Sequence, residues 1–288
     1  MPNKKLKVLC VHGLGDHRAS DWKTKWPEAI DSVFPVPGVT LDYEFLTYDD
    51  IFEQVDISFA ETAVAAAKLT VSGIGSVFRR HKGVMGDLSE KIRWTAGYVV
   101  AWVEDDGFRQ QSRDRLLEAI RTHRPNVILA HSLGSLVTYN AFTHPDAKDP
   151  EIAQILKRAT YVTFGSQINN PFVIRNTTNG RVQELGVAFW HHLYNEHDDV
   201  FTAPIRNWRA PNFNQTETPF DDEGVGDHAA ASYFRHRNTI ENVWRPLGAT
   251  AVGAKAFGSA PTVRTRAAAA KRRKQRRALL VGINDYPE

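Results

Sequence analysis

The stretch that most constrains this chain is residues 126–135, N-V-I-L-A-H-S-L-G-S. Residues 127–129 form a short apolar, largely β-branched run, which predicts a buried strand. The run leads into Ser132, which has the small residues Ala130 and Gly134 two positions away on either side, and a helix-compatible segment follows. Small flanking residues let the backbone turn sharply from strand to helix, and such a turn holds a serine hydroxyl in a strained, exposed position. Ser132 is therefore a candidate nucleophile.

A serine hydroxyl is a poor nucleophile unless an adjacent base removes its proton. In strand–turn–helix nucleophile sites, the chain order is serine, then acid, then histidine. The sequence offers Asp198 or Asp199 just after an expected strand, and then His228 in a loop before an expected helix. We predict that His228 is the base, and that one of the two aspartates fixes its tautomer and stabilises the imidazolium.

Backbone N–H groups are expected to bind the oxyanion that develops when the serine attacks a carbonyl. One is the N–H of Leu133, directly after the nucleophile, and the other is the N–H of Leu14. Leu14 follows His12 and Gly13 at the end of the first expected strand, where glycine allows the loop to approach a ligand closely. The leucine side chains would then be free to line an acyl pocket.

The order of strand and helix patterns predicts an α/β fold, with a mostly parallel sheet and helices on both faces. Alternating or continuous apolar runs predict strands at residues 6–11, 40–47, 127–129, 160–164, 189–194 and 213–218. Helical patterns cover residues 21–34, 108–123, 135–142 and 226–244. Together these elements form one expected domain at residues 1–248.

Residues 51–106 interrupt this regular alternation and read as a helical insertion. Apolar residues between positions 57 and 78 recur at steps of three and four, which predicts one amphipathic helix, although Gly73 and Gly75 weaken its far end. Residues 88–103 predict a second helix, rich in aromatic side chains. Two interpretations stay open: these helices pack against the core, or they form a lid over the site.

Composition excludes several classes of protein. The net charge of +3 gives no global basic field that would recruit nucleic acid. Cys10 is the only cysteine, so an internal disulfide is impossible and a reducing compartment is expected. The apolar run after the N-terminal lysines is too short for a signal peptide, and no stretch is long enough for a transmembrane segment. These features predict a cytoplasmic location.

A histidine-rich stretch raises the question of a metal site. His191, His192 and His197 precede the two aspartates. Adjacent residues on a strand point to opposite faces, so His191 and His192 cannot both enter one compact site. The Gly13-x-Gly15 pattern is also a poor match to a dinucleotide-binding motif, because the third glycine and the acidic residue of that motif are absent. We therefore expect no metal and no cofactor.

The sequence resembles the α/β-hydrolase superfamily, and its small lipase- and esterase-like members in particular, over residues 5–245. The resemblance implies a Ser–His–Asp triad, no cofactor, and hydrolysis of an ester, thioester or amide. Ala130 departs from the commoner glycine, as it does in some small lipase-like members. Many relatives carry Asp-Pro-Val at the acid, which favours Asp198 over Asp199. The resemblance is carried by His12-Gly13-Leu14-Gly15, Ala130-His131-Ser132-Leu133-Gly134, Asp198-Asp199-Val200 and His228.

The C-terminal region differs from the rest. Residues 249–277 are rich in Ala, Gly, Lys and Arg, which predicts a linker. The run at 277–286, R-A-L-L-V-G-I-N-D-Y, resembles the first strand of a caspase-like (metacaspase) peptidase domain. The resemblance implies that residues 278–288 begin a truncated peptidase domain, and that the hydrolase is an effector regulated by this partner in cis. The basic run at 271–277 would then be a natural cleavage site.

Two other functions compete with ester hydrolysis. A catalytically silent hydrolase fold would serve as a binding module, although every triad position is filled in this sequence. An acyltransferase would use the same residues and pass the acyl group to an acceptor other than water. The sequence does not identify the natural substrate.

Overall fold

The computed structural model describes residues 4–13, 21–54, 65, 88–198, 202–206, 208–222 and 228–253. Within these ranges, six strands form one parallel sheet in the order β2-β1-β3-β4-β5-β6. The predicted α/β class with a parallel sheet is therefore confirmed. The strands are β1 (Lys4–Val11), β2 (Val39–Leu46), β3 (Val127–His131), β4 (Thr160–Phe164), β5 (Phe189–Tyr194) and β6 (Phe213–Glu217).

The strand order reverses between β1 and β3. From β1 the chain passes to β2 on one side, and every later strand is added on the other side, starting with β3. In open parallel sheets, ligands bind outside the carboxyl ends of the strands where the order reverses. The carboxyl ends of β1 and β3 lead to His12 and Ser132, so the candidate residues from two distant parts of the sequence meet at this point.

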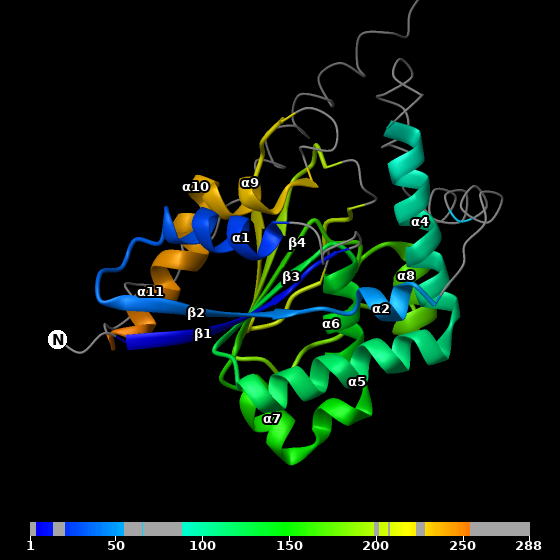
Figure 1. Ribbon diagram of the computed structural model, residues 1–288, viewed down its shortest axis with the longest axis horizontal. Coiled ribbons are helices and arrows are strands. Elements are labelled where there is room, and N and C mark those ends of the chain that lie inside the picture. Colours follow the sequence, from blue (N-terminus) through cyan, green and yellow to red (C-terminus); the bar gives the residue numbers. More distant parts are fainter. Residues whose placement is uncertain are drawn as a thin grey trace, which may run out of the picture. The chain divides into compact units, whose positions relative to one another are not determined.

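Helices cover both faces of the sheet. Figure 1 shows α1, α9, α10 and α11 on one side, and α5, α6 and α7 on the other. On β1, Val8 and Cys10 belong to one buried cluster, whereas Leu9 and Val11 belong to the other. This alternation follows from the two-residue period of a strand. The first face carries α1 (Trp22–Asp31), α9 (Ala230–Arg235), α10 (Arg237–Thr239) and α11 (Arg245–Ala251); the second carries α2 (Asp49–Phe52), α4 (Leu88–Glu104), α5 (Asp106–His123), α6 (Leu133–Thr143), α7 (Pro150–Leu156) and α8 (Pro171–Thr177).

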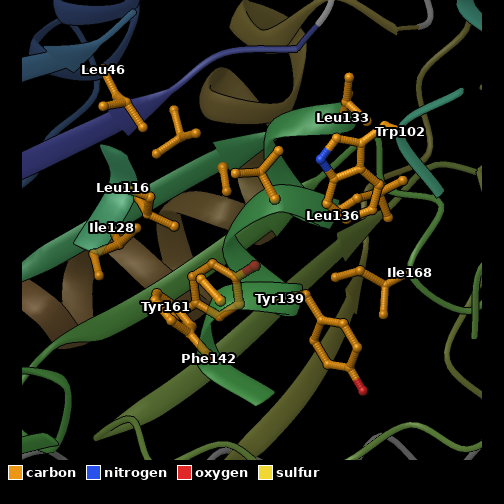
Figure 2. Close-up of a cluster of buried hydrophobic side chains, with 14 of the residues drawn as sticks. Leu46, Trp102, Leu116, Ile128, Leu133, Leu136, Tyr139, Phe142, Tyr161 and Ile168 are labelled. Carbon is orange, nitrogen blue, oxygen red and sulfur yellow. The ribbon is translucent and has the colours of Figure 1, made fainter. Parts of the chain in front are cut away.

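Helix α4 is the second helix expected in the insertion, and its C-terminal half lies in the main core. Trp102 is 1% exposed and its indole N–H donates to Ser112 Oγ of α5 at 3.0 Å. Figure 2 shows the Trp102 ring beside Leu133 and Leu136 of α6. This half of α4 thus bonds to α5 and packs against α6, the helix that follows the candidate nucleophile.

The helix expected at residues 226–244 is interrupted. Helix α9 ends at Arg235, and His236 adopts an extended backbone with φ −63° and ψ 136°. The His236 side chain accepts a hydrogen bond from the Asn238 N–H at 3.1 Å, so it caps the short helix α10. A five-residue π-helical turn, Ile240–Trp244, then leads into α11. Competition from this side-chain cap explains why the helical pattern does not continue unbroken.

Several expectations fall on residues that the structure does not describe. The residues outside the described ranges include Leu14, Asp199, most of residues 55–87 with the first helix of the insertion, and residues 254–288. The last of these hold most of the linker expected at 249–277 and the whole caspase-like strand. Helix α11 continues to Ala251, so the first residues of the expected linker are helical. Within the described part, no helix is both long enough and apolar enough to cross a membrane.

Candidate functional site

Ser132 occupies the turn between β3 and α6 in a conformation that L-residues rarely adopt. Its φ is 50° and its ψ is −126°. Such a conformation costs on the order of 1–3 kcal/mol and persists only where the surroundings enforce it. Part of that enforcement is a hydrogen bond from the Ser132 N–H to the Phe164 carbonyl oxygen at the end of β4, at 3.1 Å. The predicted strained turn is thus present at this serine.

Ser135 fixes the same turn from the first turn of α6. Its N–H donates to the Ser132 carbonyl oxygen at 2.9 Å, and its Oγ lies 2.5 Å from that oxygen. The Ser135 hydroxyl also lies 2.7 Å from Ser166 Oγ, in the loop that follows β4. Ser135 and Ser166 are both buried. Buried hydroxyl groups with these partners resist rearrangement of the turn, because breaking the contacts would leave polar atoms unsatisfied.

Two glycines are required by close backbone approach. A Cβ atom at Gly134 would lie 2.2 Å from the His12 carbonyl oxygen and 2.7 Å from that of Val11. A Cβ atom at Gly13 would lie 2.6 Å from Ser132 Cβ and 3.2 Å from Ser132 Oγ. Neither contact is sterically tolerable. The loop after β1 therefore lies directly against the Ser132 turn, as the sequence pattern predicts.

His12 is buried and is held by residues that follow β2. Its ring stacks on Tyr48 with the centroids 4.4 Å apart, and its Nε2 lies 3.5 Å from Asp49 Oδ1. The Tyr48 hydroxyl donates to the His12 carbonyl oxygen. Burial raises the pKa of Tyr48 well above its ordinary value, and the Asp49 carboxylate adds to this, so the phenol stays a donor. Sequence reasoning missed Tyr48 and Asp49, because nothing in the linear pattern links the end of β2 to the loop after β1.

Asp198 and His228 form a hydrogen-bonded pair. The Nδ1 atom of His228 lies 2.9 Å from Asp198 Oδ1 and 2.8 Å from Oδ2. The Asp198 side chain has no exposed surface, and the His228 side chain is 14% exposed. Asp198 follows β5 and His228 follows β6. The structure therefore brings Asp198 to the histidine, while Asp199 lies outside the residues it describes.

His131 is the second histidine of the site. Its Nε2 lies 2.9 Å from the His228 carbonyl oxygen, and the two rings are 4.5 Å apart at their centroids. On its other side, the His131 ring stacks on Phe164 at 5.1 Å. Gly165 makes this arrangement possible: its φ is +55°, and a Cβ there would lie 2.8 Å from His228 Cε1. His131 thus fixes the backbone that carries His228.

Ser132 and His228 are not hydrogen-bonded to each other in this structure. His228 Nε2 is buried and makes no hydrogen bond with any described residue. The hydroxyl of Ser132 is therefore not bonded to the imidazole in this conformation. Hydrogen bonds between catalytic groups are often long or misaligned without substrate and tighten in the reacting complex. A buried acceptor nitrogen without a partner is also costly in a folded protein, which makes it a natural place for a ligand's proton.

The start of α6 supplies the electrostatics on the other side of Ser132. Leu133 is the first residue of α6 and is fully buried. The first N–H groups of a helix have no partner within the helix, and the helix dipole makes this end favourable for negative charge. The Leu133 N–H thus belongs to an end of the helix suited to an oxyanion. The second expected donor, the N–H of Leu14, is outside the described ranges.

The described residues contain no group of three or more His, Cys, Asp or Glu side chains arranged to hold a metal ion. His191 and His192 lie on β5, and burial lowers the pKa of each to about 4. His192 Nδ1 lies 2.8 Å from Thr163 Oγ1 on β4. Both rings are therefore neutral at pH 7, and His192 is part of the hydrogen-bonded interior.

Comparisons with known proteins do not identify a family for this chain. The sequence matches no family model and no curated protein. One solved structure, of an uncharacterized protein from Pseudomonas aeruginosa, is 10% identical, with a TM-score of 0.27. The alignment covers 89% of this chain and 51% of the other, so this chain spans about half the length of that one. A likeness at this level supports no argument about function.

Proposed function

We propose that this protein is a serine hydrolase that cleaves an ester, thioester or lipid acyl bond, with Ser132 as nucleophile, His228 as base and Asp198 as the orienting acid. One observation carries the proposal. A serine held at φ 50° between a central strand and a helix shares the same sheet edge with a hydrogen-bonded Asp198–His228 pair. Strain of this kind clusters at active sites, where the surrounding structure maintains it for function.

In the first half of the reaction, Ser132 Oγ attacks the acyl carbon while its proton moves to His228 Nε2. Because Asp198 accepts hydrogen bonds from Nδ1, Nε2 is the nitrogen that carries the lone pair. Asp198 then stabilises the imidazolium that forms. The tetrahedral intermediate collapses when His228 returns the proton to the leaving alcohol or thiol, and this leaves an acyl group on Ser132.

In the second half, an acceptor hydroxyl replaces the leaving group. His228 takes a proton from water, the hydroxide oxygen attacks the acyl carbon, and the proton returns to Ser132 Oγ as the acid is released. An alcohol or amine acceptor would follow the same path and make the protein an acyltransferase. Nothing in the described residues favours that outcome over hydrolysis.

The negative charge on the carbonyl oxygen needs donors that are fixed before the reaction. The N–H of Leu133 at the start of α6 is one proposed donor, and the N–H of Leu14 is the other. Support for the second comes from the loop that leads to it, because Gly13 packs directly against Ser132 and His12 is clamped by Tyr48 and Asp49.

We also propose that the fold is that of the α/β hydrolases. The supporting observations are the all-parallel sheet, the serine at the β3–α6 turn, and the placement of the acid after β5 and the histidine after β6. In this chain, the half of α4 that packs in the core would form one wall beside the acyl site. Hydrolysis at Ser132 does not require the rest of residues 51–106 to act as a lid.

The test is hydrolysis of short p-nitrophenyl esters by the wild type and by Ser132→Ala. We expect kcat to fall by at least about 10³-fold in the variant, with unchanged folding. Ser32→Ala is the matched control, because Ser32 is exposed and lies just after α1, where its hydroxyl donates to the Ala29 carbonyl oxygen. Turnover that survives in Ser132→Ala would refute the assignment.

Two further measurements separate the competing functions. A fluorophosphonate probe should label wild type at Ser132, as identified by peptide mass, and should leave Ser132→Ala unlabelled. A binding module would give neither labelling nor turnover. Product analysis with added alcohol or amine acceptors separates hydrolysis from acyl transfer, since only a transferase would give mainly the transferred product.

A further inference from the structure

Asp198 has a second partner besides the histidine. The hydroxyl of Tyr233 donates to Asp198 Oδ2 at 2.7 Å, and the same oxygen lies 2.8 Å from His228 Nδ1. Tyr233 is fully buried in α9, with its ring against Phe220 at 5.0 Å and Phe164 at 5.8 Å. No motif in the sequence pointed to this tyrosine.

The tyrosine and the histidine reach the carboxylate from the same short segment. His228 precedes α9 and Tyr233 lies within it, only five positions later, whereas Asp198 follows β5. A residue in a helix can be placed more accurately than a residue in a loop, because its rotamer and backbone are both constrained. Tyr233 therefore connects Asp198 to α9, the helix that directly follows His228.

The surroundings of the Tyr233 hydroxyl favour its protonated form. Burial raises the pKa of Tyr233 well above its ordinary value, and the charge of Asp198 adds to this effect. Tyr233 can therefore only donate to the carboxylate. A donor of this kind withdraws negative charge from the oxygen that faces the imidazole, and so it weakens the stabilisation of the imidazolium by Asp198.

We propose that Tyr233 is a positioning residue that orients Asp198 and sets the base strength of His228. The inference rests on the proposed function, because it concerns the same Ser–His–Asp site. With the hydroxyl present, the carboxylate is held for Nδ1, and Oδ2 accepts from Tyr233 as well as facing the imidazole. The imidazolium that forms when His228 accepts the serine proton is then stabilised less than it would be without the tyrosine hydroxyl.

Other titratable groups also face this pair. His131, at the end of β3, stacks on His228. Tyr194 of β5 is close enough for Asp198 to act on it: burial is the main cause that raises its pKa, and Arg206, Glu196, Asp198 and Glu217 all act on it as charges. None of these groups is changed by a substitution at Tyr233, so a difference between wild type and a Tyr233 variant isolates the hydroxyl.

The experiment is an NMR titration of the His228 ring, labelled with ¹³C and ¹⁵N, in the full chain. Tyr233→Phe keeps the ring and removes only the hydroxyl. We expect the pH midpoint of the His228 resonances to rise by about 0.5 to 1 pH unit, because the Asp198 oxygen that faces the imidazole then loses a competing donor. The acidic limb of the kcat/KM profile should move by the same amount. An unchanged midpoint in a folded variant would overturn the inference.

Two comparisons exclude a purely structural role. Tyr139→Phe removes a buried hydroxyl that accepts a hydrogen bond from the Gln183 N–H at 2.7 Å, away from Asp198, so it should cost stability without moving the midpoint. Incorporating 3-fluorotyrosine at position 233 strengthens the donor and should shift the midpoint down. This second shift keeps the proposal testable if Tyr233→Phe fails to fold.

The titration and the esterase assay can fail independently. If Ser132→Ala retains turnover while the Tyr233→Phe midpoint rises, the proposed function is wrong and the tyrosine still tunes the histidine. If Ser132→Ala is inactive and the midpoint does not move, only the role of Tyr233 is refuted. In an Asp198→Asn background, Tyr233→Phe should give less than about a twofold further change in kcat, because the shared partner has lost its charge.

Discussion

The Nδ1 atom of His228 lies 2.8 Å from Asp198 Oδ2, although the two residues are 30 positions apart and follow different strands. The parallel sheet explains this contact, since the carboxyl ends of β5 and β6 open at the same edge. His131, the last residue of β3, and Gly165, which directly follows β4, complete the support for the His228 ring. Four neighbouring strand ends thus converge on one imidazole.

Replacing Asp198 by Asn should remove most of the activity. The amide can present an N–H to Nδ1, which favours the wrong tautomer of His228 and removes the charge that stabilises the imidazolium. We expect kcat to fall by about 10⁴-fold. Steady-state kinetics on a p-nitrophenyl ester measures this. Asp222→Asn is the control, because Asp222 is exposed and bonds Ser232 outside the site; equal losses in both variants would contradict the assignment.

Gly134→Ala should damage both folding and the site. The added Cβ would lie 2.2 Å from the His12 carbonyl oxygen, which is backbone and cannot move without displacing the loop after β1. We expect a loss of about 1–3 kcal/mol in the free energy of unfolding, together with a fall in kcat. Urea denaturation and the esterase assay measure the two effects.

The control for that substitution is Gly186→Ala. A Cβ at Gly186 would meet nothing within 4 Å, so alanine there should leave activity unchanged and alter stability by less than about 1 kcal/mol. A Gly134→Ala protein as stable and active as Gly186→Ala would show that the β1 loop does not pack on the turn as described.

The buried His192 should make stability depend on pH. Its folded-state pKa is lowered to about 4 by burial. Below its unfolded pKa of about 6.5, the unfolded chain takes up a proton that the folded protein does not. The contribution of His192 to the free energy of unfolding is complete above about pH 6.5. It falls by on the order of 1 kcal/mol per pH unit as the pH drops towards 4.

Urea denaturation of wild type and His192→Asn at pH 7.0 and 5.0 tests this expectation. The amide of asparagine can retain the hydrogen bond to Thr163 but cannot titrate. Wild type should lose more stability between the two pH values than the variant, because the other ionisable groups contribute equally to both. Identical losses would mean that His192 titrates alike in the folded and unfolded states.

Trp102→Ala should show that the C-terminal half of α4 is part of the core. The indole is 1% exposed and bonded to Ser112, so its removal should cost about 3–5 kcal/mol of unfolding free energy. Val252→Ala, at a side chain that is 49% exposed, should change stability by less than about 0.5 kcal/mol. A loss below 1 kcal/mol at Trp102 would indicate that this part of α4 detaches from the body of the protein.

Much of the fold could be predicted because the strands are short, apolar and regularly spaced. Residues 160–164 and 189–194 are strands with the predicted bounds, since β-branched and aromatic side chains fill both buried faces there. The helix after His228 was predicted as one unit, because periodicity cannot show that His236 caps a separate helix. Helix α8 was not predicted, although Asn170 caps it and Pro171 is its first residue, which together form a recognisable start.

By itself, the sequence determined the parallel α/β class, the position of Ser132 at a strand–helix turn, and an aspartate and a histidine in the order such a site requires. These properties depend on local pattern and chain order. Only the tertiary structure decided that Asp198 contacts His228, that Tyr233 donates to the same carboxylate, and that Tyr48 and Asp49 hold His12. Such contacts join strand ends far apart in the chain, so they depend on the sheet's strand order and register, which local pattern does not encode.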